Sequence, residues 1–93
     1  MNDDKICKHC FVKGRVQGVY FRYYTLQQAQ HLGVTGWARN LNDGRVEVLA
    51  CGETKAVENL CVWLHEGSPL SNVTEVKCQI INQPDYPKSF EIG

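Results

Sequence analysis

A glycine-rich stretch at residues 14–22, Gly-Arg-Val-Gln-Gly-Val-Tyr-Phe-Arg, carries residue types that can bind an anion. Gly14 and Gly18 allow the backbone to turn its N–H groups inward into a concave nest. An apolar pattern at helical spacing begins at Phe21, and the first amides of a helix are unpaired and partly positive. Arg22 adds a planar guanidinium that suits phosphate oxygens. The stretch predicts a site for a phosphoryl group, although the glycine spacing alone favours a plain strand-to-helix connection.

The segments around this stretch alternate between strand and helix patterns. Alternating apolar residues and turn signals predict strands at residues 6–13, 34–39, 45–51, 72–81 and 90–92. Apolar residues at helical spacing predict helices at 21–32 and 57–64, the first stopped by Gly33 and the second closed by Gly67-Ser68-Pro69. Asn42-Asp43-Gly44 predicts a hairpin turn. The order βαββαβ, followed by a tail with the short strand at 90–92, predicts a ferredoxin-like α+β sandwich, in which two helices pack on one face of an antiparallel sheet.

Two motifs resemble the signatures of one known family. Residues 14–22 match the first acylphosphatase signature, Gly-x-Val-Gln-Gly-Val-x-Phe-Arg, and residues 36–47 are similar to the second, Gly-Trp-x-x-Asn-x-x-Asp-Gly-x-Val-Glu. Gly67-Ser68-Pro69 and the closing Ser89-Phe90-Glu91-Ile92 also resemble the family, so the likeness spans nearly the whole chain. The resemblance implies the ferredoxin-like fold and the metal-independent hydrolysis of acyl phosphates without a cofactor. Tyr20 stands where the family often has glycine, cysteine or phenylalanine, and its ring is expected to affect the pocket mouth.

The resemblance also implies a role for each residue of the two motifs. The amides of the loop would hold the phosphoryl oxygens, while Arg22 would neutralise the charge that develops on them. Asn40 would hold the attacking water, although without the motif a turn-forming asparagine is the preferred interpretation. Gln17 is expected to brace the loop. The predicted catalytic residues are Arg22 and Asn40, and the predicted substrate-binding residues are Arg15, Val16, Gln17, Gly18, Val19 and Tyr20.

The length and the charge of the chain argue against several classes of protein. The 93 residues predict one domain over 1–93, with residues 1–5 as a flexible tail. Ten basic residues balance ten acidic ones, so no broad positive field is available for nucleic acid or an anionic membrane. The chain has no apolar run that could span a bilayer, and its polar start is unlike a secretory signal. We therefore expect a cytoplasmic monomer that binds an acyl phosphate as substrate and inorganic phosphate as product and competitive ligand.

Alternative functions differ in the residues that they require. A single-strand RNA reader on this fold needs exposed aromatic residues on two central strands and a basic surface, and the sequence predicts neither. A module that binds an acyl phosphate without turning it over would not need Asn40. A purely structural protein would leave the stretch at 14–22 without a purpose. The sequence does not select one physiological acyl phosphate.

Five cysteines are an odd number and too few for a disulfide scaffold. In a strand Cys7 and Cys10 point to opposite faces, which argues against a metal ion shared by them. The first and third strands of a ferredoxin-like sheet are antiparallel neighbours, and the alternation places Cys7 and Cys51 on the open face. A Cys7–Cys51 disulfide is therefore a hypothesis, against which stands the reducing cytoplasm.

Overall fold

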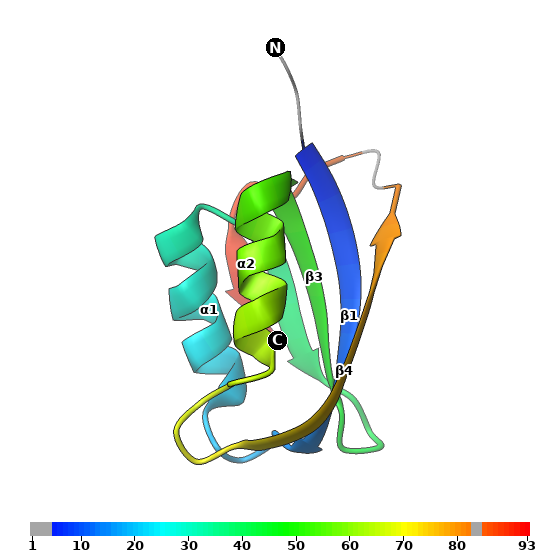
Figure 1. The fold of residues 1–93 in the computed structure, drawn as a ribbon. Helices are drawn as coiled ribbons and strands as arrows, with labels where there is room; N and C mark the ends of the chain where they lie inside the picture. The colour runs from blue at the N-terminus through cyan, green and yellow to red at the C-terminus, as the bar shows by residue number, and fades with distance from the viewer. Residues whose placement is uncertain (1–4, 83–84) are drawn as a thin grey trace.

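The computed structural model describes residues 5–82 and 85–93. Two helices lie side by side against one face of a five-stranded sheet (Figure 1). Along the chain the elements are β1 (Lys5–Arg15), α1 (Phe21–Leu32), β2 (Thr35–Asn40), β3 (Val46–Glu53), α2 (Thr54–Leu64), β4 (Asn72–Ile81) and β5 (Phe90–Ile92). The predicted ferredoxin-like α+β fold is confirmed. Of the predicted tail, residues 1–4 lie outside the described residues, and Lys5 begins β1.

The sheet has the strand order β4-β1-β3-β2-β5. β1 pairs antiparallel with both β3 and β4, and β2 pairs antiparallel with β3. β5, however, runs parallel to β2, so the sheet is mixed rather than antiparallel throughout. The difference follows from the chain path, because β5 starts at the end of the sheet where β4 finishes and lies at the far edge (Figure 1).

β1 is longer than the sequence pattern predicts. It continues through Gly14 and Arg15, which pair with Val73 and Asn72 beyond a register shift. At Gly14 the backbone has φ 125°, and a Cβ atom there would lie 2.1 Å from the carbonyl oxygen of Asn72. Only glycine permits this close approach of two backbones. Gly14 thus serves strand pairing, and the loop to α1 begins after Arg15.

The main core lies between the helices and the sheet. The predicted alternation of β3 is confirmed, since Val46, Val48 and Ala50 are fully buried on the helix-facing side. Both helices bury one apolar stripe against this face, as their periodicity predicts. The buried helix residues are Phe21, Thr25 and Ala29 of α1 and Val57, Leu60 and Leu64 of α2. No helix among the described residues is long and apolar enough to cross a membrane.

Two disulfides join β1 to its neighbours, one on each face of the sheet. Cys7 and Cys51 face each other in the β1–β3 register and are bonded on the open face, which confirms the predicted bridge. Cys10 and Cys78 face each other in the β1–β4 register and are bonded on the helix-covered side. The second bridge was not predicted, although β1 and β4 are also neighbours in this fold.

Candidate active site

A hollow of about 390 Å³ opens where β1 passes into α1. Residues from four segments line it: the loop at 16–20, the first turn of α1, the end of β2 and the end of β5. The lining residues are Val16, Gly18, Tyr20, Phe21, Arg22, Tyr23, Asn40 and Ile92. The fold therefore brings the two predicted catalytic residues, Arg22 and Asn40, into one pocket.

The loop at 16–20 is anchored by its valines and curved by its left-handed residues. Val16 and Val19 are buried, at 1% and 5% exposure, so their side chains hold the loop against the core. Gly18 and Tyr20 have φ 75° and 60°, and such left-handed steps turn neighbouring N–H groups toward one side. Within residues 5–82 and 85–93, the backbone amides of 16–20 donate to no protein acceptor. These donors remain available to an anion.

The start of α1 adds positive charge to the same place. The amide of Tyr24 donates to the carbonyl of Tyr20 at 3.1 Å, and no side chain caps the helix start. The first turn contains no acidic residue. Arg22 is half-buried, and its guanidinium has no hydrogen bond or ion pair to any described residue. An uncapped helix start and an unneutralised arginine together favour a bound anion.

Asn40 is the last residue of β2, and its position on the strand directs it to the pocket. Ala38, two residues earlier, is fully buried beneath the helices, so Asn40 lies on the same helix-facing side. Its exposed side chain makes no hydrogen bond within the described part of the chain. A turn-forming asparagine would bond its own backbone. In this hairpin Asp43 does so instead, accepting from the Arg45 amide at 3.1 Å.

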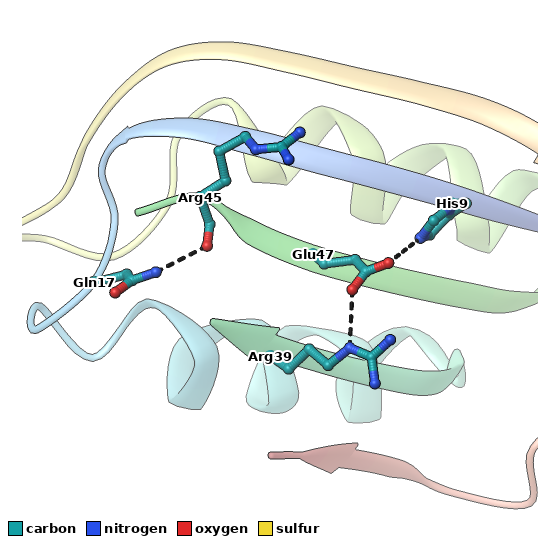
Figure 2. A network of polar contacts seen from close by, with 5 residues as sticks. All are labelled: His9, Gln17, Arg39, Arg45 and Glu47. Carbon is teal, nitrogen blue, oxygen red and sulfur yellow. Dashed lines mark hydrogen bonds and ion pairs between the residues drawn. The ribbon is translucent and has the colours of Figure 1, made fainter. Parts of the chain in front are cut away.

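Gln17 ties the loop to the β2–β3 hairpin. Its side-chain amide donates to the carbonyl oxygens of Leu41 and Arg45, at 2.8 and 2.9 Å, and Figure 2 shows the bond to Arg45. The hairpin is closed by a bond of 2.8 Å from the Leu41 amide to the Arg45 carbonyl. The expectation that Gln17 braces the loop is confirmed. The brace fixes the loop relative to Asn40, which directly precedes the hairpin.

Three predicted binding residues are not among those that line the hollow. Arg15 is the last residue of β1 and is exposed, with Asn72 as its strand partner. The side chains of Gln17 and Val19 are engaged by the hairpin and the core. Any contact of these two residues with a ligand must therefore come from their backbone amides.

Three lining residues were not predicted, namely Phe21, Tyr23 and Ile92. Phe21 and Tyr23 flank Arg22 on the helix, and their part in the pocket depends on how α1 sits on the sheet. Ile92 reaches the pocket because β5 pairs with β2, with Ile92 beside Ala38. The likeness of residues 89–92 to the family was a signal for this segment, but it did not indicate the neighbouring strand.

Three polar residues on the open face of the sheet, His9, Arg39 and Glu47, are paired with one another. Glu47 receives a hydrogen bond of 2.8 Å from Nε of Arg39, and its other oxygen lies 2.6 Å from Nε2 of His9 (Figure 2). Burial raises the pKa of Glu47, but the hydrogen bonds from Arg39 and His9 outweigh it and leave the pKa below its ordinary value. His9 is thus a structural partner of Glu47.

Comparison with known proteins agrees with this geometry. A family model described as acylphosphatase matches residues 8–92. An acylphosphatase from Halorhodospira halophila is 56% identical over 84 residues, which are 90% of each chain. The solved acylphosphatase from Coxiella burnetii has a TM-score of 0.91 and 40% identity, covering 97% of this chain and 94% of that one. The acylphosphatase from Bacillus subtilis also has a TM-score of 0.91, with 35% identity and coverage of 95% and 98%. Matched over almost its whole length in sequence and in fold, the chain belongs to the acylphosphatase family of enzymes.

Proposed function

We propose that the chain hydrolyses the carboxyl–phosphate bond of acyl phosphates without a metal ion, with the loop and Arg22 holding the phosphoryl group and Asn40 positioning the water. One observation carries the proposal. A single pocket is lined by Val16, Gly18 and Tyr20 of the loop, by Arg22 and by Asn40, and the loop amides, the Arg22 guanidinium and the Asn40 side chain have no partner among the described residues.

The phosphoryl group enters the cradle formed by the loop amides and the start of α1. Its oxygens accept hydrogen bonds from these amides, and the guanidinium of Arg22 spans two oxygens in one plane. As the bond to the acyl oxygen loosens, charge spreads over the equatorial oxygens, and the same donors stabilise it. Binding and charge stabilisation therefore come from one set of groups.

Asn40 acts on the attacking water. Its amide accepts from or donates to the water and holds it opposite the departing acyl oxygen, as in-line displacement requires. The water oxygen bonds to phosphorus while the acyl oxygen leaves with the electron pair of the broken bond. We infer, by analogy with the family, that a phosphoryl oxygen takes the proton of the water.

The leaving group explains why this pocket needs no general acid. A carboxylic acid has a pKa of about 4, so the carboxylate departs in its stable form at neutral pH. An alkyl phosphate monoester would instead release an alkoxide, which needs a proton donor. Among the described residues, none that line the pocket has a histidine or carboxylate side chain. The same groups should therefore hydrolyse acyl phosphates and leave alkyl monoesters intact.

The first experiment compares benzoyl phosphate with an alkyl phosphate monoester, in the presence of a chelator. We expect turnover of benzoyl phosphate alone and no loss of rate on adding the chelator. Hydrolysis of both substrates, or loss of activity with the chelator, would contradict the proposed mechanism. A binding module without turnover would hydrolyse neither.

Inorganic phosphate supplies the second test, because substrate and product share the group that the cradle recognises. We expect phosphate to inhibit competitively, raising KM without changing kcat. Purely noncompetitive inhibition would place phosphate outside the cradle. The cytoplasmic location, the monomeric state and the organisation of residues 1–93 as one domain remain parts of this proposal, which size-exclusion chromatography and cell fractionation can test.

A further inference from the structure

Three cysteine side chains converge between the sheet and α2, away from the pocket. They come from three elements: Cys10 from β1, Cys78 from β4 and Cys61 from α2. Their Sγ atoms all lie within 4.8 Å of one another, and those of Cys10 and Cys61 are 3.7 Å apart. Cys10 and Cys78 form a disulfide, whereas Cys61 carries a free thiol. The mechanism proposed above uses none of these sulfurs.

We propose that the reduced form of this three-cysteine cluster binds a thiophilic divalent cation of the zinc group. The site forms when a dithiol reductant gives two electrons and two protons to the Cys10–Cys78 bond and becomes a disulfide itself. Cys10, Cys61 and Cys78 then lose their thiol protons to solvent as the cation binds, because thiolates are the ligands.

The spacing of the sulfurs suits such a cation. A tetrahedral zinc ion with Zn–S bonds of ~2.3 Å holds its sulfurs roughly 3.8 Å apart. The Cys10–Cys61 separation of 3.7 Å is close to this value. Cys10 and Cys78 are directly opposite in the β1–β4 register, with Cα atoms 4.0 Å apart. Cleavage of their disulfide lets the sulfurs separate by side-chain rotation, with the strand pairing unchanged.

Burial and charge favour a divalent cation over a monovalent one. Cys10 is fully buried, while Cys61 and Cys78 are partly exposed, so one side of the cluster is open to solvent. Water from that side can complete four-coordination. Three thiolates around a divalent cation leave one net negative charge, half of what a monovalent cation would leave, and buried charge is costly. Because the ligands are thiolates, binding releases protons and weakens as the pH falls.

A thiol–disulfide exchange at the same place fits the geometry less well. Attack by Cys61 along the Cys10–Cys78 bond needs the three sulfurs in a line. In such a line Cys61 lies 3.7 Å from Cys10, and Cys78 lies a further ~2.05 Å away on the other side. The sulfurs of Cys61 and Cys78 would then be farther apart than the observed limit of 4.8 Å between any two of the three sulfurs. The sulfurs instead form a triangle, whose centre is close to all three.

The test uses the full chain, reduced with a phosphine under nitrogen and titrated with Cd²⁺ as a spectroscopic substitute for Zn²⁺. Three proteins are compared: the wild type, Cys61→Ala and Cys51→Ala. Cys61→Ala removes one proposed ligand and keeps both disulfide-forming pairs. Cys51→Ala is the matched control, since it removes a cysteine outside the cluster. Thermal unfolding and acyl phosphate hydrolysis confirm that each variant is folded, and Cys78→Ala replaces Cys61→Ala if the latter does not fold.

We expect the wild type and Cys51→Ala to bind one Cd²⁺ with a thiolate charge-transfer band, and a large excess of Zn²⁺ to displace the Cd²⁺. Bound cation should protect Cys10, Cys61 and Cys78 from alkylation, as mapped by mass spectrometry. Cys61→Ala should bind at least ~100-fold more weakly, because loss of even an outer-shell partner costs up to that factor. The proposal is overturned if the wild type shows no such band, if Cys61→Ala binds as tightly as the wild type, or if Cys51→Ala loses binding.

Discussion

Two arginines of this chain stand in opposite settings. Arg39, on the open face of the sheet, donates to Glu47 and lies over the ring of Trp37 with its guanidinium carbon 4.2 Å from the ring centre. Arg22, in the pocket, has no partner among residues 5–82 and 85–93. The difference extends to their neighbourhoods: polar groups around Arg39 are paired, whereas the loop amides and Asn40 beside Arg22 are not. Unpaired donors gathered in a hollow indicate a ligand site, while paired ones indicate structure.

The largest effect that we expect is a loss of stability on the open face of the sheet, where the polar groups around Arg39 are paired. Cys51→Ala removes the Cys7–Cys51 bridge, which closes a loop with a sequence separation of 44 residues. Chain-entropy arguments put the loss of unfolding free energy at roughly 4 kcal/mol for a loop of this size. Denaturant unfolding without reductant measures it, and kcat should be unchanged.

The free cysteine supplies a control for this measurement. Cys61→Ala, made and measured in the same way, should cost far less because Cys61 forms no disulfide. If both variants lose the same unfolding free energy, the bridge adds nothing beyond side-chain packing.

The next largest effect is on phosphate recognition in the pocket that contains Arg22. Arg22→Lys keeps the charge but loses the planar fork, so kcat/KM should fall by at least ~3 kcal/mol, nearly as far as in Arg22→Ala. Phosphate binding should weaken in parallel, with the unfolding temperature preserved. Arg39→Lys is the matched control and should leave kcat/KM nearly unchanged. If Arg22→Lys loses less than ~1.4 kcal/mol, the two-oxygen contact is wrong and the loop amides alone recognise phosphate.

Asn40→Ala should lower kcat and leave the affinity for phosphate nearly unchanged. Placement of the water matters mainly in the transition state, so kcat should fall by roughly 10²-fold or more with little change in phosphate binding. Steady-state kinetics and a phosphate inhibition constant separate the two quantities. Asn42→Ala, in the adjacent turn, is the control. A wild-type kcat in Asn40→Ala would remove the water-positioning role.

The smallest effect concerns the backbone of the loop. Tyr20 has φ 60°, which costs a non-glycine residue roughly 1–2 kcal/mol, and the residue is 71% exposed. Tyr20→Gly should therefore raise the unfolding free energy by up to ~1 kcal/mol after the entropy cost of glycine. Gly18→Ala, with φ 75° and open space around it, should lower that free energy by about the same amount. Equal stability of all three proteins would show that the loop stores no such strain.

Local patterns in the sequence were sufficient for most of the fold. The alternation of Val46, Val48 and Ala50 is confirmed because these residues join the core beneath the helices, and the helical spacing from Val57 to Leu64 is confirmed because α2 buries one face. Side-chain parity also predicted the Cys7–Cys51 bridge. The extension of β1 through Gly14 was not predicted, because a glycine in the sequence indicates the end of a strand unless the partner strand is known.

The site could be predicted in its parts but not in its arrangement. The motifs indicated Arg22 and Asn40, yet that both line one pocket depends on α1 and the end of β2 meeting in space. The contribution of Ile92 depends on the parallel pairing of β5 with β2, which no local pattern specifies. The Cys10–Cys78 bridge likewise required the pairing of β1 with β4.

The central claim is that the amides of residues 16–20 and the guanidinium of Arg22 hold the phosphoryl group. The most direct test is a titration of isotope-labelled protein with inorganic phosphate, followed by the chemical shifts of backbone amides and arginine Nε–H groups. We expect the largest, saturable changes at the loop amides and at Nε of Arg22, with Arg39 unaffected. Saturable changes centred on Arg39 and the open face, or no saturable change at the loop, would contradict the account.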